Sequence, residues 1–142
     1  MAERLTLAYR APMRMGPTLE PSGGGDDQLS VRTERPDPGT TVLHVRGEVD
    51  MLTSSRLQTS IEQSLDAEPQ VLVVDLEDVG FLGTSGLAAL IQIRGAARLA
   101  GAELRLACTN RQVLRPLALA GLTGLFSIYE SVPAALDAQL AE

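Results

Sequence analysis

The sequence predicts an α/β domain with a mixed, mainly parallel sheet packed with helices, on three observations. Strand-like and helix-like segments alternate from residue 28 onward, as expected when right-handed crossovers join parallel strands. The segment QVLVVDL at 70–76 is apolar almost throughout, as in a central strand covered on both faces. The 142 residues are 44% hydrophobic but only 3% aromatic, so one domain can form and its core must be aliphatic.

The first 27 residues differ in composition from the rest and predict a flexible tail. The segment APMRMGPTLEPSGGGDD at 11–27 is rich in Pro and Gly and shows no apolar period. Such a segment buries too little apolar surface to offset the entropy lost on ordering. We therefore assign 1–27 to a tail and 28–142 to a single folded domain.

Charge and hydropathy restrict the classes of function. The formal net charge is −6, so the chain repels phosphate backbones, and direct nucleic-acid binding is not expected. No apolar run approaches the roughly 20 residues that cross a bilayer. The N-terminus also lacks the apolar segment of a signal peptide. We therefore expect a cytoplasmic protein with no membrane partner.

The folded part is expected to begin with a β-hairpin. Apolar and polar residues alternate at its start, with Leu29, Val31 and Thr33 on one side, as in a half-buried strand. The segment PDPG at 36–39 predicts a turn. The apolar-rich segment 41–50 then predicts the second strand of the hairpin.

A helix is expected to link the hairpin to the central strand. Leu57, Ile61 and Leu65 recur every fourth residue within 53–68, which predicts a helix with one buried face. Thr53 can cap the start of this helix.

A second helix follows the central strand. The segment FLGTSGLAAL at 81–90 leads into it, and the helix is expected to run to about Ala100 and to end at Gly101. At about 100° per residue, its core-facing stripe comprises Ala89, Leu90, Ile93, Ala96, Ala97 and Ala100.

A different stripe of the same helix comprises Leu87, Ile91, Arg94 and Arg98. Two aliphatic side chains beside two arginines suit a protein-binding surface if they are exposed. In the alternative interpretation, the sheet covers Leu87 and Ile91 as well.

The rest of the chain predicts two further strands and two helices. The strands are expected at 103–108 and 125–130, and a short helix within 110–122 is expected to be broken by Pro116. Ser131 is the expected cap of a closing helix. The buried stripe of that helix is expected to comprise Val132, Leu136 and Leu140.

Small polar residues at the start of the second helix mark the candidate site. They follow a buried strand, and ligands of open α/β sheets bind at the carboxyl ends of strands, beside helix N-termini. Ser85 has two candidate roles there. It can cap the helix through its hydroxyl, or it can accept a phosphoryl group that the helix N-terminus stabilises. Its spacing alone leaves both open, although capping is the commoner role.

Four blocks of sequence together resemble the STAS domain of bacterial anti-sigma factor antagonists. They are GEVD at 47–50, VVDLEDVGFLGTSGLAAL at 73–90, GAELRLAC at 101–108 and LALAGLTGLFSIYES at 117–131. The resemblance covers about residues 28–142, and it implies a mixed sheet packed with helices. In this family the unphosphorylated antagonist binds an anti-sigma factor, usually a serine kinase, and so frees a sigma factor. Phosphorylation of a serine breaks that complex, and a phosphatase restores it.

The resemblance implies roles for individual residues. The family's Asp-Ser-Ser-Gly falls on 83–86, so Ser85 corresponds to the usual phosphoacceptor, with Thr84 as the alternative. Gly83 replaces the Asp, a change that bears on recognition by a kinase. Asp50 corresponds to a family residue near the same site; its alternative role is that of a loop or helix-cap acid. With the second stripe of the helix, the expected partner-binding set is Asp50, Gly83, Thr84, Ser85, Gly86, Leu87, Ile91 and Arg94.

Three other functions have weaker support in the sequence. GTSG differs from the G-x-S-x-G nucleophile elbow because Leu87 stands at the last Gly, and the only histidine precedes the serine. We therefore expect no enzyme and no catalytic residue. The segment GGG at 23–25 follows no strand, and no P-loop motif is present, which leaves at most weak nucleotide binding. The main alternative is a STAS scaffold or constitutive binder that is not phosphorylated, because Gly83 lacks the carboxylate.

The remaining reactive side chains are assigned structural roles. Cys108 at the end of a strand is expected to be a small buried hydrophobe. His44 is interpreted as a strand residue rather than a ligand, Asp75 as a strand-end acid and Asp78 as a turn acid. Because the chain has one cysteine and one histidine, we expect no metal site and no cofactor.

Overall fold

The computed structural model describes residues 28–140. Its strands are β1 (Leu29–Asp37), β2 (Thr40–Val49), β3 (Val71–Leu82), β4 (Glu103–Ala107) and β5 (Ser127–Tyr129). Its helices are α3 (Ser54–Ser64), α4 (Thr84–Leu99), α5 (Arg111–Leu119) and α6 (Val132–Asp137), with short 3₁₀ helices η1 (Leu65–Ala67) and η2 (Thr123–Leu125). The predicted tail at 1–27 lies outside the described residues. No helix of the described part is long and apolar enough to cross a bilayer.

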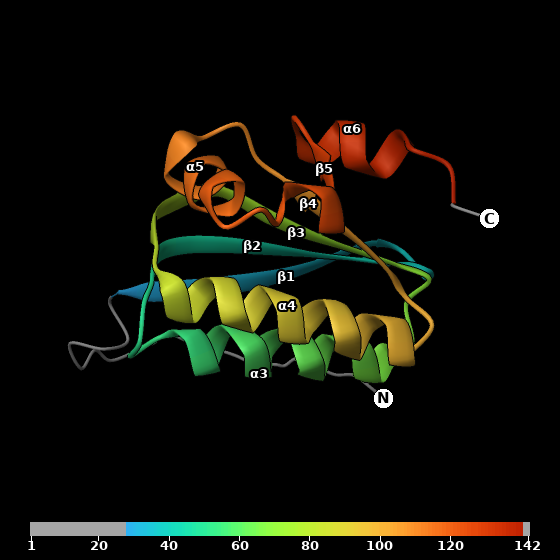
Figure 1. The fold of residues 1–142 in the computed structure, drawn as a ribbon. Helices are drawn as coiled ribbons and strands as arrows, with labels where there is room; N and C mark the ends of the chain where they lie inside the picture. The colour runs from blue at the N-terminus through green and yellow to red at the C-terminus, as the bar shows by residue number, and fades with distance from the viewer. Residues whose placement is uncertain (1–27, 141–142) are drawn as a thin grey trace.

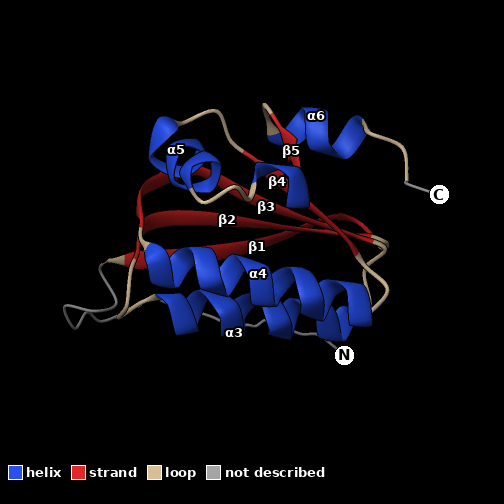
Figure 2. Cartoon of the chain, in the orientation of Figure 1, coloured by secondary structure: helices blue, strands red, loops and turns tan. Residues whose placement is uncertain are grey.

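The strands form one sheet in the order β1-β2-β3-β4-β5. The pair β1–β2 is antiparallel, and the three other pairs are parallel. In Figures 1 and 2, α3 and α4 lie side by side along one face of the sheet, whereas α6 lies on the other side. The prediction of a mixed, mainly parallel sheet packed with helices is therefore confirmed.

Successive residues of each strand face opposite sides of the sheet, so the buried apolar side chains form two clusters. The main cluster lies against α3 and α4 and includes Leu43, Val45, Leu72, Val74, Leu57, Ile61, Leu90 and Ile93. A smaller cluster, centred on Val42, Val73 and Ala135 of α6, lies on the other face. Because β3 contributes to both clusters, nearly all its residues up to Leu76 must be apolar, which explains the sequence of this segment.

Gly47 is required by the backbone of the hairpin. Its φ is +116°, a conformation that L-residues with side chains rarely adopt, and a Cβ here would lie 2.1 Å from the carbonyl oxygen of Gln28. That carbonyl accepts a 2.7 Å hydrogen bond from the Glu48 N–H. The glycine of the GEVD block therefore allows the first strand to approach the second.

The first strand is less buried than its alternation predicts. Leu29 is buried and Val31 is half-buried, but Thr33 is exposed, because β1 is an edge strand with a neighbour on one side only. The strand also continues to Asp37, so the turn predicted at 36–39 is shorter than expected.

The central strand extends further than predicted, to Leu82. Asp75 is therefore not at the strand end. Asp78 lies within β3 rather than in a turn, and its backbone is opposite that of Arg46 in β2. β3 pairs with β4 only as far as Asp75, which lies opposite Ala107. The Asn110 side chain replaces part of that pairing by donating to the carbonyl oxygens of Leu76, Glu77 and Val79.

Pro116 does not break the helix in which it lies, contrary to the prediction. The helix α5 continues past Pro116 to Leu119, with Val113 and Leu117 fully buried. Asn110 caps its start by accepting a 2.9 Å hydrogen bond from the Val113 N–H. A proline removes one backbone hydrogen bond, and the buried face and the cap are sufficient to keep the helix intact.

The closing helix is shorter than predicted and buries a different side. Ser131 caps it as expected, by accepting a 3.1 Å hydrogen bond from the Ala134 N–H, but α6 ends at Asp137. Ala135 is its buried residue, whereas Leu136 is 37% exposed and Leu140 is 50% exposed. The expected stripe through Leu136 and Leu140 is therefore wrong, because the helix has only six residues and meets the sheet through the small side chain of Ala135.

Candidate functional site

The chain brings its GEVD and GTSG segments together at the ends of two parallel strands. Glu48 pairs with Phe81 and Val49 with Leu82. The Gly83 N–H then donates a 2.9 Å hydrogen bond to the Val49 carbonyl. The loop that carries Asp50 therefore lies beside the start of α4.

The first turn of α4 presents Thr84 and Ser85 without using either as its cap. Gly83 is the N-cap residue, and no side-chain cap hydrogen bond is formed. Thr84 is exposed and Ser85 is half-buried. The interpretation of Ser85 as the N-cap is therefore wrong, because the helix begins at Thr84 and its N-cap is Gly83.

A shallow hollow adjoins Ser85 between the first turns of α3 and α4. Its volume is about 260 Å³, and it is lined by Ser54, Ser55, Gln58, Ser85, Ala88, Ala89 and Gln92. The Gln58 amide donates a 3.3 Å hydrogen bond to Gln92 and so connects the two helices. None of the lining side chains is charged. The hollow therefore provides hydroxyl and amide groups but no cation.

Gly86 allows α4 to start against the strand ends. It is buried, and a Cβ at this position would lie 2.5 Å from Leu82 Cδ1 and 2.8 Å from Val49 Cγ1. Both neighbours are core residues, with 4% and 0% exposure, so neither can move away easily. The glycine thus fixes the position of Ser85 relative to the ends of β2 and β3.

Gly86→Ala should therefore destabilise the fold, by about 1–3 kcal/mol for overpacking. The matched control is Gly95→Ala in the same helix, where a Cβ meets nothing within 4 Å. That control should stabilise the protein by about 0.5–1 kcal/mol through helix propensity. Urea denaturation of both variants measures the free energies of unfolding. Equal effects of the two substitutions would contradict the close approach at Gly86.

Asp50 orders the loop between β2 and α3. Its Oδ1 accepts hydrogen bonds from the N–H groups of Leu52, at 2.9 Å, and Thr53, at 3.2 Å. The Thr53 hydroxyl accepts from the Asp50 N–H at 2.9 Å and donates to the Glu48 carbonyl at 2.7 Å. Thr53 occupies the N-cap position of α3 but makes no side-chain cap hydrogen bond. Asp50 thus has the structural role of a loop acid and also lies at the candidate site.

Three exposed apolar side chains beside this loop were not identified from the sequence. Met51 is 81% exposed, Leu52 is 71% exposed and Phe81 is 50% exposed. Such side chains near a site are typical of a protein-binding surface. The signal available in the sequence was the pair Met51–Leu52, two large apolar residues in a loop.

The second stripe of α4 is only partly exposed. Leu87 is half-buried and packs against the main core, so it is covered as in the alternative interpretation, whereas Ile91 remains 43% exposed. The Arg94 Nε donates a 3.0 Å hydrogen bond to the Leu125 carbonyl, so this side of the helix faces η2. In the predicted core stripe, Ala96 is half-buried, and Ala100, the C-cap residue of α4, is exposed.

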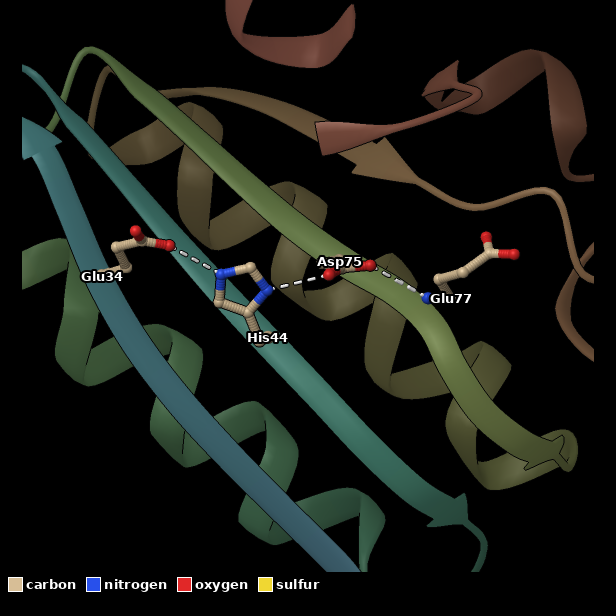
Figure 3. Close-up of polar contacts among 4 residues, drawn as sticks. All are labelled: Glu34, His44, Asp75 and Glu77. Carbon is tan, nitrogen blue, oxygen red and sulfur yellow. Dashed lines mark hydrogen bonds and ion pairs between the residues drawn. The ribbon is translucent and has the colours of Figure 1, made fainter. Parts of the chain in front are cut away.

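His44 lies on the face of the sheet opposite α3 and α4 (Figure 3), whereas Ser85 belongs to α4. Its Nδ1 is 2.8 Å from Asp75 Oδ2, and its Nε2 is 2.8 Å from Glu34 Oε1. Both ring nitrogens are thus engaged between two strands. Serine and histidine cannot form a nucleophile–base pair in this arrangement. Among residues 28–140, no group of three His, Cys, Asp or Glu side chains could hold a metal ion.

Cys108 lies just after β4 and is 2% exposed, as predicted for a small buried hydrophobe. Burial, with the nearby carboxylates of Glu77 and Asp75, raises the pKa of the thiol to about 11. Glu77 is itself fixed, because it accepts hydrogen bonds from the backbone N–H and the hydroxyl of Thr109.

The Cys108 thiol should be almost inert toward alkylation in the native protein. At any pH below both values, a rise of its pKa from 9.0 to about 11 lowers the thiolate fraction roughly a hundredfold. Only the thiolate reacts. At pH 8, iodoacetamide should therefore modify the folded chain at least a hundred times more slowly than the urea-unfolded chain. Similar rates in the two states would show that Cys108 is accessible and reactive.

The raised pKa of Cys108 also predicts how stability depends on pH. Because the folded state holds the thiol proton more tightly than the unfolded state, the free energy of unfolding should decrease as pH rises from about 9 toward 11.

Comparison with known proteins identifies the family. A model of the STAS domain matches residues 32–135. The anti-sigma-F factor antagonist RsfB of Mycobacterium tuberculosis (strain ATCC 25618 / H37Rv) is 34% identical over 101 residues, which are 69% of this chain and 80% of RsfB. Its relative RsfA, from the same strain, is 27% identical over 99 residues, which are 68% of this chain and 77% of RsfA.

Solved structures share the fold. An anti-sigma factor antagonist from Mycobacterium paratuberculosis has a TM-score of 0.70 at 30% identity, over 81% of this chain and 95% of its own. The antagonist SpoIIAA, in its unphosphorylated form, has a TM-score of 0.64 at 16% identity, over 76% of this chain and 94% of its own. The family match, the relatives and the shared fold agree with the sequence resemblance. The chain therefore belongs to the STAS domain family.

Proposed function

We propose that this protein is an anti-sigma factor antagonist that binds an anti-sigma factor through the surface around Ser85 and thereby frees a sigma factor. The observation that carries the proposal is the arrangement at the start of α4, where Ser85 is left unused as a cap beside exposed Met51, Leu52 and Phe81. The similarity to the antagonist RsfB supports the same partner class. We expect the chain to act by binding and not by catalysis, because no acid or histidine of residues 28–140 lines the hollow beside Ser85.

Phosphorylation of Ser85 is the proposed control of this binding. A phosphoryl group there would sit in the favourable field of the α4 N-terminus, so the domain itself tolerates the charge. The uncharged hollow beside Ser85 supplies no cation to neutralise the charge when a partner covers it. Thr84 is the alternative acceptor, since it is exposed in the same turn.

The proposed partner is an anti-sigma factor of the serine kinase type, which would both bind the chain and modify it. A phosphatase would restore the unphosphorylated form, and all three proteins would act in the cytoplasm. Asp50, Gly83 and Ile91 complete the proposed binding surface, and buried Gly86 positions the first turn of α4 for it. Arg94 contributes by linking α4 to η2.

A constitutive binder is the second candidate function, and one observation favours it. A Cβ at Gly83 would lie 3.0 Å from the Phe81 ring, so the aromatic side chain closely approaches the position where the family has an Asp side chain. In this alternative the surface is the same, but no kinase modifies Ser85.

Two exposed leucines allow a matched test of the binding surface. Leu52 lies beside the candidate site, whereas Leu99, which is 93% exposed, lies at the opposite end of α4. Leu52→Asp should weaken binding to the anti-sigma factor of the same organism at least tenfold, and Leu99→Asp should change it less than twofold. Isothermal titration calorimetry measures both affinities, and circular dichroism confirms the fold. Unchanged affinity of folded Leu52→Asp would exclude this surface.

A further inference from the structure

Basic charge collects on one part of this acidic chain. Between Val79 and Tyr129 the sequence has five arginines and a single acid, Glu103. The carboxylate of Glu103 forms an ion pair with buried Arg105, at 2.9 Å from its Nε. The four other arginines of this segment belong to α4 and α5. They therefore form a local excess of positive charge in a chain whose net charge is −6.

Hydrogen bonds connect α4, η2 and α5 in succession. The Arg94 Nε donates to the Leu125 carbonyl at 3.0 Å, which joins α4 to η2. The Leu122 N–H donates to the Leu117 carbonyl at 2.8 Å, which joins the approach to η2 with α5. Leu125, the last residue of η2, is therefore in contact with α4.

Three arginines on this surface have exposed side chains with no hydrogen bond or ion pair among residues 28–140: Arg98, Arg111 and Arg115. Arg111 and Arg115 are one turn apart, on the side of α5 opposite its buried residues. Arg111 is also the first residue of α5, where the helix dipole disfavours a cation. No intramolecular contact within the described chain offsets that cost.

Two exposed leucines belong to the same group of elements, Leu119 to α5 and Leu125 to η2. Leu119 is 76% exposed and follows Arg115 by one turn, and Leu125 is 42% exposed. We call the surface formed by Arg98, Arg111, Arg115, Leu119 and Leu125 the arginine ridge. Exposed aliphatic side chains on elements that also carry exposed guanidinium groups are typical of a protein interface.

We propose that the arginine ridge is a second docking surface, separate from Ser85, for an acidic polypeptide segment that carries aliphatic side chains. The planar guanidinium group pairs with carboxylates through two parallel hydrogen bonds. The leucines add apolar contacts that a nucleic-acid backbone would not use. The net negative charge of the chain also disfavours long polyanions. Charge and hydropathy together therefore favour an acidic, aliphatic protein segment.

A peptide probe tests the proposal on the full chain. The probe is a fluorescein-labelled peptide of alternating Glu and Leu, compared by fluorescence anisotropy with one of alternating Glu and Ser. The Glu–Leu peptide should bind at least fivefold more tightly. Leu119→Ser should remove that difference, because it removes an apolar contact. The double variant Arg111→Glu/Arg115→Glu should weaken Glu–Leu binding at least tenfold.

The matched control is Arg32→Glu/Arg35→Glu, which makes the same change of charge at two exposed arginines of β1. It should alter the affinity less than twofold. An equal loss in the control would overturn the proposal, because overall charge would then explain the binding. Binding of a DNA oligonucleotide as tightly as the peptide would also overturn it, as would self-association of the chain that the ridge variant abolishes.

The test is independent of the function proposed for Ser85. Ser85→Glu should leave the affinity for the Glu–Leu peptide unchanged, whereas it should weaken anti-sigma factor binding. Weaker peptide binding in Ser85→Glu would place the peptide at the Ser85 surface and overturn the assignment to the ridge.

Discussion

Ser85→Glu should fold normally and lose its anti-sigma factor partner. Within the domain the added charge lies at the N-terminus of α4, where it is tolerated. At an interface the same charge must be desolvated beside a hollow whose lining side chains are all uncharged. A penalty of about 2–4 kcal/mol weakens binding roughly thirty- to a thousandfold. Calorimetric titration of the anti-sigma factor measures this loss.

Ser85→Ala provides the control because it removes the hydroxyl without adding charge. It should bind nearly as well as the natural chain and resist the kinase. Thr84→Ala should bind and still be phosphorylated. If Ser85→Glu bound as tightly as Ser85→Ala, a charge at this position would not control the complex.

Replacing Arg105 should cause the largest loss of stability in the fold. Its side chain is 1% exposed and joins β4 to the C-terminal segment. Nη1 donates to the carbonyl oxygens of Ala135 and Ala138, and Nη2 donates to that of Gln139. Nε pairs with Glu103 at 2.9 Å. Arg105→Met keeps much of the volume but removes all these donors, which should cost about 3–5 kcal/mol.

Chemical denaturation of Arg105→Met measures that cost, and hydrogen exchange should show faster opening at 135–139, where carbonyls lose their donors. Arg98→Met is the matched control, because Arg98 is exposed on α4, and it should change stability by less than about 0.5 kcal/mol. A loss below about 1 kcal/mol in Arg105→Met would show that packing, and not this arginine, holds α6 on the sheet.

The fold class could be predicted because period and composition are local properties. The apolar segment of β3 and the fourfold spacing in α3 each follow from burial on particular faces. The positions of helix ends and tertiary contacts could not be predicted in the same way. The helix α6 ends early and buries Ala135, and Arg105 contacts carbonyls some thirty residues away, which no local pattern indicates.

The candidate site could be predicted in position but not in detail. The order of strand, small residues and helix predicted that 83–86 would lie at a strand end, and the structure places these residues there beside Asp50. The role of Gly83 as N-cap depends on where the helix begins, a boundary that spacing leaves uncertain. The exposure of Met51 and Leu52 depends on a loop ordered by Asp50, which a sequence pattern does not reveal.

Peptide mass mapping after incubation with the anti-sigma factor of the same organism and ATP tests the central claim most directly. The account predicts one phosphoryl group, located on Ser85, and none on the Ser85→Ala variant. Phosphate on Thr84 alone would move the acceptor by one residue. An unmodified chain, under conditions where the same kinase phosphorylates another antagonist, would contradict the proposed switch and favour the constitutive binder, with Gly83 in place of the family's acid as the physical reason.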